Sequence, residues 1–329
     1  MYYPIKLKKI TKNSINNIDI DEDLLNELLL KNIIECPYST FPYMTGKNSK
    51  ESQELYGCGN CVAMSINLQK MLKKHNIKSK LVPATIPKMY YMPDFLDISH
   101  VAVLILKNDK EGYLIDPAFY FLEPMKININ DRENNVIPWK NVYRGDEEDL
   151  TYNIQHLNHD LKYNDYQTIP KNTYMIETFR TNDPSDKWNY YLTEITNPDN
   201  AITSFNLTSK KFPFMASLDE QLNLKLFIKY IDRDNLKIKY DGNEVYNGNY
   251  DNIPDDIMET MNPHLSKHFG KSYKKSIKCP ASADTKIYRL TDHNRISKKK
   301  KRNPSTKKKK KHSKKKNRSV KFKSNVSYI

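Results

Sequence analysis

The chain has 329 residues, of which 38% are hydrophobic and 11% aromatic, and its formal net charge is +15. A chain of this size can bury a large core, so a globular protein is predicted. The mean hydropathy of −0.78, the small number of glycines and the lack of a long apolar run argue against membrane-spanning and collagen-like proteins. The N-terminus has no apolar segment or cleavage site typical of a signal peptide, so an intracellular, non-secreted protein is expected.

The positive charge is concentrated at the C-terminal end. Residues 295–329 contain 17 Lys and Arg and no acidic residue, which leaves 54 − 17 = 37 basic and 39 acidic residues in the remainder. A segment of this composition cannot bury apolar surface, so a disordered basic tail is predicted from residue 291 onward. Its lysines suit nuclear import, binding to nucleic acid or an anionic surface, or retention in a virion; a solubilising appendage is the alternative.

Helical patterns occur in the first quarter of the chain. Residues 22–34 begin with acids and carry leucines at helical spacing, which predicts an amphipathic helix. Residues 36–54 contain two prolines and a polar run, so a connector lying largely on the surface is expected. After a glycine-rich turn, apolar residues recur at helical spacing from Cys61 to His75, and Cys61 is therefore predicted to begin a helix.

β-like patterns follow this helix. Lys80–Thr85 predicts a strand, and Val101–Leu106 with Tyr113–Ile115 predicts a hairpin. The stretch between them, residues 86–99, is interpreted as a loop bordering a site. Later segments favour strands at 173–180, 189–196 and 222–231, a hairpin at 236–246 around Asp241-Gly242, and a last helix at 254–269 that Pro263 should kink.

Three residues suit thiol chemistry. The unpaired backbone N–H groups at a helix N-terminus favour the thiolate form of Cys61. His100 begins one predicted strand and Asp116 ends the strand expected to pair with it, so a hairpin can bring the two together. The imidazole would then take the thiol proton, and the carboxylate would fix the tautomer of the imidazole. Each of the latter two residues taken alone is more often a structural residue.

Neighbouring residues are candidates for supporting roles. Gly59 and Asn60 would form the tight turn before Cys61 and bring a substrate carbonyl close to backbone donors, as part of an oxyanion hole. Tyr90, Tyr91 and Phe119 are candidates for lining an acceptor pocket, although the tyrosines could simply cover a loop.

The motif Cys58-x-x-Cys61 has an alternative interpretation as half of a zinc site or as a redox pair. No second Cys-x-x-Cys pair exists, and Cys36 and Cys279 are isolated. His264 and His268 have a His-x(3)-His spacing, but they lie among polar residues without a ligand-like grouping with the cysteines. No metal is therefore expected.

The order of these motifs resembles two families of papain-like ancestry, the arylamine N-acetyltransferases and the transglutaminase-like proteins. Both have Gly-x-Cys opening a helix, a histidine beginning one strand and an aspartate ending the next. The residues that carry the resemblance are Gly59-Asn60-Cys61, Ser99-His100-Val101-Ala102-Val103 and Tyr113-Leu114-Ile115-Asp116.

The downstream region separates the two families. Residues 188–270 follow the acetyltransferase order of strands and a final helix, so the resemblance to that family covers roughly residues 20–270. Two motifs depart from it: Arg-Gly-Gly-x-Cys is replaced by Tyr56-Gly57-Cys58-Gly59-Asn60-Cys61, and Asp116-Pro117 is closer to transglutaminase-like proteins.

The resemblance to the acetyltransferases implies an α+β, papain-like cysteine acyltransferase fold with an antiparallel β-rich middle and lid. Its expected parts are a helical part at 1–90, a β part with His100 and Asp116 at 91–180, a lid with the final helix at 181–290, and the tail at 291–329.

The implied activity is N-acetylation in a ping-pong reaction: Cys61 accepts the acetyl group of acetyl-CoA and passes it to an arylamine, hydrazine or similar small amine. The alternatives are a transglutaminase-like or thiol-protease activity through the same residues, and an inactive, nucleic-acid-associated structural protein such as a component of a viral particle.

Overall fold

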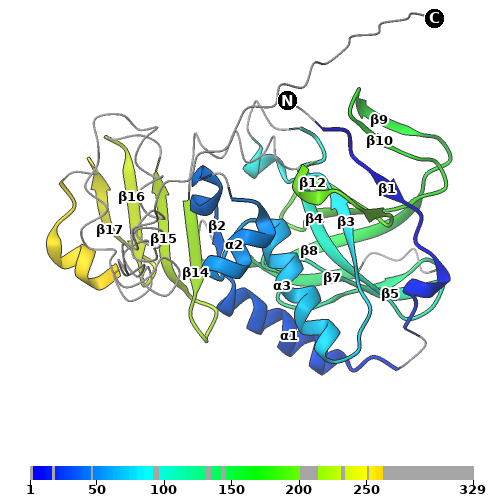
Figure 1. Ribbon diagram of the computed structural model, residues 1–329, viewed down its shortest axis with the longest axis horizontal. Helices are drawn as coiled ribbons and strands as arrows, with labels where there is room; N and C mark the ends of the chain where they lie inside the picture. The colour runs from blue at the N-terminus through cyan, green and yellow to red at the C-terminus, as the bar shows by residue number, and fades with distance from the viewer. Residues whose placement is uncertain are drawn as a thin grey trace, which may run out of the picture.

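The structure is a computed structural model that describes residues 3–16, 19–45, 47–91, 96–130, 135–141, 146–200, 214–230, 234–249 and 252–261. Three helices lie against a large antiparallel sheet, and a smaller antiparallel sheet stands beside them (Figure 1). The predicted α+β class, with an early helical part and an antiparallel β-rich middle and lid, is therefore confirmed. The predicted basic tail lies outside the described residues.

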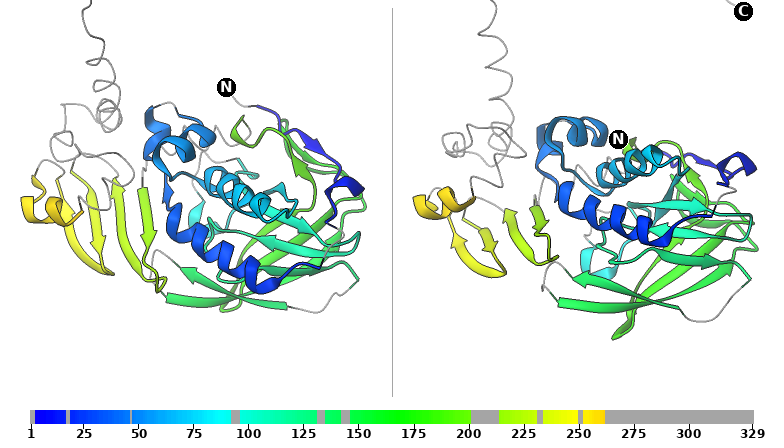
Figure 2. Two further views of the ribbon diagram at one scale, coloured as in Figure 1. Left: turned by 60° about the horizontal axis from the view of Figure 1, so that its bottom comes forward. Right: turned by 90° about the horizontal axis from the view of Figure 1, so that it is seen from below.

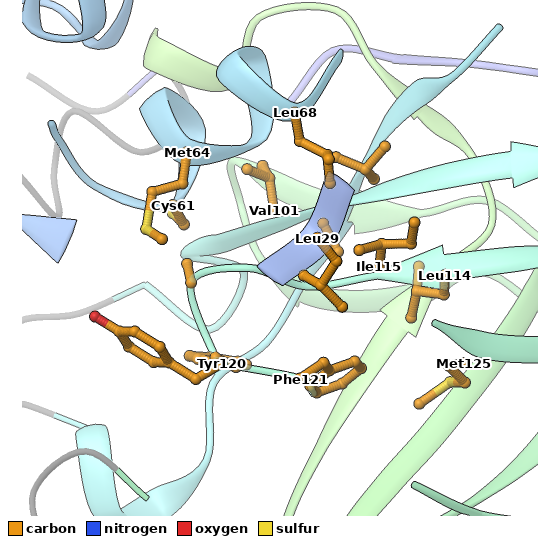
Figure 3. Close-up of a cluster of buried hydrophobic side chains, with 14 of the residues drawn as sticks. Leu29, Cys61, Met64, Leu68, Val101, Leu114, Ile115, Tyr120, Phe121 and Met125 are labelled. Carbon is orange, nitrogen blue, oxygen red and sulfur yellow. The ribbon is translucent and has the colours of Figure 1, made fainter. Parts of the chain in front are cut away.

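The main helices are α1 (Glu22–Glu35), α2 (Ser49–Tyr56) and α3 (Cys61–Lys74). The helices predicted at 22–34 and from Cys61 are both confirmed. All three helices lie on the same side of the large sheet (Figure 2). Met64 and Leu68 of α3 lie over Val101 of the sheet, with Leu29 of α1 close by (Figure 3). This buried apolar layer holds the start of α3 over the sheet.

The large sheet has eight antiparallel strands in the order β6-β5-β4-β3-β12-β11-β8-β7. Backbone contacts also join β7 to the segment that follows β5: Phe121 and Trp139 form a bridge, and Leu122 N donates to Pro138 O at 3.0 Å. The sheet therefore curls so that its two ends meet around a common interior. Its strands are β3 (Lys80–Ala84), β4 (His100–Leu106), β5 (Glu111–Ile115), β6 (Met125–Asn128), β7 (Asn135–Asn141), β8 (Asp146–His156), β11 (Tyr174–Arg180) and β12 (Asp183–Tyr191).

The smaller sheet has five antiparallel strands in the order β17-β16-β15-β14-β2. At the turn between β16 and β17, Asp241 (φ 47°) and Gly242 (φ 76°) both have positive φ, which confirms the hairpin predicted at that dipeptide. The strands are β2 (Tyr38–Ser39), β14 (Phe214–Leu218), β15 (Leu224–Tyr230), β16 (Leu236–Tyr240) and β17 (Asn243–Gly248).

Short elements complete the described part of the chain. β1 (Leu7–Lys8) pairs with β13 (Glu194–Ile195), and β9 (Leu161–Asn164) pairs with β10 (Gln167–Ile169). The 3-10 helices are η1 (Lys12–Ser14), η2 (Phe41–Thr45) and η3 (Lys88–Tyr90). Residues 255–261 are helical, where the last helix is predicted to begin, while Pro263 and the rest of that helix lie outside the described residues.

The expectation of a surface connector at residues 36–54 is wrong. This stretch contains β2, η2 and most of α2, and Cys36, Tyr38 and Phe41 are buried. The reason is a long-range pairing, because β2 forms the edge strand next to β14, about half the chain away. Proline and polar residues mark the ends of these short elements, and the local pattern alone reads as a loop.

Sheet membership also crosses the expected division at residue 180. β11 and β12, which lie on either side of it, are neighbours in the large sheet, whereas β2 from the helical part joins the smaller sheet. In the part of the chain that the structure describes, no helix is long and apolar enough to cross a membrane.

Candidate active site

Cys61 is the first residue of α3, and Asn60 caps this helix. The side-chain oxygen of Asn60 accepts hydrogen bonds from the backbone N–H groups of Val62 at 3.1 Å and Ala63 at 3.3 Å. An asparagine in this position satisfies helix donors that would otherwise lack acceptors. The cap therefore fixes the first turn of α3 and, with it, the position of the Cys61 side chain.

A buried polar network holds the cap in turn. The hydroxyls of Tyr43 and Ser49 lie 2.7 and 3.0 Å from the same Asn60 oxygen, and the Asn60 N–H donates to Tyr43 at 3.0 Å. Burial raises the pKa of the Tyr43 hydroxyl well above its usual value, so the hydroxyl stays protonated and able to donate. Both residues come from the stretch expected to be a connector, and sequence reasoning did not identify them.

Gly59 lies where no side chain fits. A Cβ at this position would lie 2.3 Å from the Ala63 Cβ and 2.8 Å from the Tyr43 hydroxyl. The predicted tight turn is therefore present, and close approach explains its glycine.

The backbone donors of this turn are already used. The Gly59 N–H donates to the Pro37 carbonyl at 3.3 Å, and the Asn60 N–H is bonded to Tyr43. The N–H groups of Gly59 and Asn60 are thus bonded within the protein, and the part of these two residues in an oxyanion hole stays a prediction. Among the described residues, the Cys61 N–H at the helix start has no acceptor, so it is the amide that remains for such a contact.

His100 and Asp116 lie directly beside Cys61. His100 begins β4 and Asp116 follows β5, and the imidazole Nε2 is 2.6 Å from the Asp116 Oδ2. The Cys61 thiol is hydrogen-bonded to the same imidazole. Because Nε2 faces the carboxylate, Nδ1 is the ring nitrogen left for the sulfur. The structure therefore brings together all three residues predicted for thiol chemistry.

Both oxygens of Asp116 are hydrogen-bonded. Oδ1 accepts from the backbone N–H groups of Ala118 at 3.1 Å and Phe119 at 3.0 Å, while Oδ2 accepts from the Tyr190 hydroxyl at 2.6 Å. These donors stabilise the ionised carboxylate in a fully buried position.

Tyr190 reaches Asp116 because of strand register. Tyr190 of β12 pairs with Ala84 of β3, and Ala84 pairs with His100 of β4, so the three residues form one row across the sheet. Sequence reasoning placed Tyr190 in a strand but gave it no role at the site. Its only signal was that strand pattern, because the residue lies 74 positions from Asp116.

The surroundings favour a charged imidazole. Burial by itself lowers the pKa of His100, but the Asp116 charge, the Cys61 sulfur and its hydrogen bonds to both raise the pKa to about 10. Burial raises the pKa of Cys36 to about 12 and that of Cys58 still higher, so these two thiols stay protonated. Of the three described cysteines, Cys61 is the one with an imidazole as partner.

A cluster of aromatic rings lies beside the imidazole. Phe119 stacks on the His100 ring with centroids 3.8 Å apart, and Tyr90 stacks on Phe119 at 5.7 Å. The ring of Trp188 meets Phe119 edge-on at 5.8 Å. Two of the three predicted pocket residues therefore lie at the site. The third, Tyr91, is 49% exposed and has no ring contact with the described residues of the site.

The cysteines form no disulfide in the described part of the chain, where Cys36, Cys58 and Cys61 are free thiols. Within the same residues, no group of three or more His, Cys, Asp or Glu side chains is arranged to hold a metal ion. Cys279 lies outside the described residues.

No protein-family model matches the sequence, and no curated protein matches it. Solved structures do match. An arylamine N-acetyltransferase of Bacillus cereus is 17% identical, with a TM-score of 0.47 over 76% of this chain and 91% of that chain. Another from Mycobacterium tuberculosis is 11% identical, with a TM-score of 0.47 over 84% of this chain and 96% of that chain. A third from Bacillus anthracis is 18% identical, with a TM-score of 0.45 over 78% and 93% of the two chains. The solved structures to which this chain is similar are thus arylamine N-acetyltransferases, the family that its cysteine, histidine and aspartate motifs resemble.

Proposed function

We propose that this protein transfers the acetyl group of acetyl-CoA to a small amine through an acetyl-cysteine at Cys61. The observation that carries the proposal is the relay from the thiol of Cys61 through His100 to Asp116, with 2.6 Å between the imidazole and the carboxylate. Such an arrangement activates a thiol for attack on acyl compounds.

In the first half-reaction, the Cys61 thiolate attacks the thioester carbonyl of acetyl-CoA. The Cys61 N–H lies at the helix start, where it can donate to the oxyanion that forms. When the C–S bond to CoA breaks, the protonated His100 gives its proton to the departing thiolate. The products are acetyl-Cys61 and free CoA.

In the second half-reaction, an amine attacks the acetyl carbonyl and His100 accepts the amine proton. Phe119 stacks on the imidazole and Tyr90 stacks on Phe119, and aromatic rings of this kind suit a planar acceptor such as an arylamine or hydrazine. Because the Cys61 side chain is buried, with the residue 1% exposed, covering side chains have to move before either substrate reaches the sulfur.

Intact-mass spectrometry of the protein mixed with acetyl-CoA tests the first half-reaction. The wild type and Cys58→Ala should each gain one acetyl group, and Cys61→Ala should gain none. Cys58 is a suitable control because it is also buried, three residues away, and has a raised pKa. If none of the proteins gains an acetyl group and iodoacetamide does not select Cys61, the proposed activity is wrong. Acylation of Cys61 by a glutamine peptide or a peptide ester, and not by acetyl-CoA, would instead indicate a transglutaminase-like or thiol-protease activity.

For the basic tail, we propose a separate role in binding polyanions such as nucleic acid inside the cell. Its support is charge alone: 17 Lys and Arg in residues 295–329 with no acidic residue. Binding of this kind releases counterions, so it should weaken steeply as salt rises. Deleting residues 295–329 should abolish DNA binding and leave acetylation of Cys61 intact. DNA binding that survives the deletion would contradict this role, and DNA binding without any Cys61 chemistry would favour an inactive structural protein.

A further inference from the structure

The interior of the large sheet contains a row of polar and aromatic side chains that leads away from the triad. Tyr190, Trp188 and Asp186 are alternate residues of β12, so they lie on the same face of the strand. Tyr190 bonds Asp116, and Trp188 meets Phe119, the ring that covers His100. Asp186 is the next member of the row on the side away from Tyr190.

Asp186 is a buried carboxylate with too few partners. The residue is 4% exposed, and neither of its oxygens has a hydrogen-bond partner. Among the described residues, the cation that pairs with Asp186 is Arg180, whose guanidinium nitrogen lies 3.7 Å from Oδ2. Arg180 is already bonded through two nitrogens to Glu148, at 2.9 and 3.2 Å. The Arg180 guanidinium thus pairs with two buried carboxylates, and it lies farther from Asp186 than from Glu148.

A buried charge without hydrogen bonds is costly, so it usually marks a place for a missing partner. The neighbouring Thr178 of β11, which pairs with Trp188, is also buried and has an unpartnered hydroxyl. The rings of Trp188 and Phe119 lie between Asp186 and the imidazole. A buried carboxylate beside aromatic rings suits a cation, since aromatic faces attract positive charge.

We propose that Asp186 binds the ammonium group of the acyl acceptor, which would be an arylamine carrying an alkylammonium chain at the end opposite to its reacting nitrogen. This inference rests on the proposed acetyl transfer and specifies its acceptor. Four residues of strand separate Tyr190 from Asp186, which corresponds to roughly 13 Å. An acceptor that spans the triad and Asp186 therefore has its two nitrogens on the order of 10 Å apart.

The transfer step balances without any further reactant. The uncharged aniline nitrogen attacks the carbonyl of acetyl-Cys61, the C–N bond forms and the C–S bond breaks. Cys61 leaves as the thiolate, and His100 takes the proton released by the nitrogen. The distal ammonium keeps its charge throughout and serves only to position the acceptor.

Two acceptors of similar length, one with an ammonium group and one without, test whether Asp186 recognises the positive charge. 4-(4-Aminobutyl)aniline carries the ammonium, and 4-pentylaniline has a methyl group in its place. Wild-type kcat/KM should be about tenfold higher for the ammonium compound, and Asp186→Asn should make the two values similar. Glu177→Gln is the matched control, because it removes a carboxylate that pairs with Lys187 on the other face of the same hairpin, and it should keep the preference. Asp186→Glu, which keeps the charge, should retain a preference too.

Equal kcat/KM for the two acceptors in the wild type would overturn the inference, and so would a preference that persists in Asp186→Asn. Thermal melting checks that each variant folds. Either overturning result leaves acetylation of Cys61 untouched, so it would not count against the proposed function.

Binding gives a readout that does not depend on acetyl transfer. The two tryptophans of the chain, Trp139 and Trp188, are both buried, and Trp188 lies in the row next to Asp186. 4-Phenylbutylammonium should change the tryptophan emission of the wild type and Glu177→Gln but not of Asp186→Asn, while 4-phenylbutanol should have no effect. This result without acetylation of Cys61 would support the cation site and refute the proposed function. No change with either ligand would mean that water satisfies Asp186, and the inference would be wrong.

Discussion

The hydroxyl of Tyr190 donates to the same oxygen of Asp116 that meets the His100 imidazole, and both distances are 2.6 Å. This shared oxygen makes Tyr190 a positioning residue for the triad, because it orients the carboxylate that orients the imidazole. Burial raises the pKa of Tyr190 well above its usual value, and the neighbouring Asp116 charge adds to the shift. The hydroxyl therefore stays protonated at neutral pH and can donate to the carboxylate.

Tyr190→Phe should lower kcat/KM for acetyl transfer by about tenfold, the value expected for losing one hydrogen bond to a charged group. The pH at which activity rises should also move, since the Asp116 charge seen by His100 changes. Tyr191→Phe is the control: Tyr191 is equally buried, lies on the other face of β12 and bonds Tyr163 instead. A Tyr190→Phe variant with an unchanged rate and pH profile would show that the contact has no role in positioning.

Stability should depend on pH through His100. Its pKa is raised to about 10 in the folded protein from about 6.5 in an unfolded chain. The protonated imidazole is thus bound more tightly in the folded state, and its contribution is fully present below pH 6.5 and lost as pH rises through 10. The melting temperature of the wild type should fall between pH 7 and pH 10 more steeply than that of His100→Gln. Parallel curves for the two proteins would contradict the raised pKa.

Gly59→Ala should destabilise the protein by about 1–3 kcal/mol, because the added Cβ would overlap Ala63 and the Tyr43 hydroxyl. Gly248→Ala is the matched control, since the nearest atom to its added Cβ, in Tyr246, is 3.4 Å away. Urea unfolding of the two variants measures the difference. Equal free energies of unfolding would mean that the turn before Cys61 relaxes easily.

Asn60→Ala should both lower stability by about 1 kcal/mol and slow alkylation of Cys61, because the cap fixes the helix turn that carries the thiol. Asn48→Ala removes the cap of α2 in a capping box and should cost similar stability with little effect on Cys61. Iodoacetamide labelling rates and thermal melts separate the two effects. If both variants slow the labelling of Cys61 equally, a general loss of stability, and not the Asn60 cap, determines the reactivity of the thiol.

The local sequence pattern was sufficient to predict an element when the residues that determine it lie close together in the chain. Cys61 at a helix start and the β4–β5 hairpin follow from periodicity and turn residues within a few positions. The local pattern was insufficient to predict that Tyr43 and Ser49 are buried at the site. They lie among prolines and polar residues that read as a surface connector, and they are buried only because β2 pairs with β14.

The strands between residues 125 and 169 were also not predicted, although three of them, β6, β7 and β8, belong to the large sheet. β7 begins and ends with Asn and β8 begins Asp-Glu-Glu-Asp, and these residue types have weak β propensity. Cross-strand contacts with neighbouring strands stabilise these segments as strands in spite of their weak β propensity.

The sequence by itself determined the identity, order and local geometry of Cys61, His100 and Asp116, because a helix start and a hairpin are short-range structures. Only the tertiary structure decided which groups surround them. Tyr190 reaches Asp116 through register across three strands, and Phe119 covers His100 after a turn that Asp116 itself holds. Asp186 joins the same interior because the sheet curls until β7 meets the segment after β5. These contacts depend on pairing between segments far apart in the chain, which no local pattern encodes.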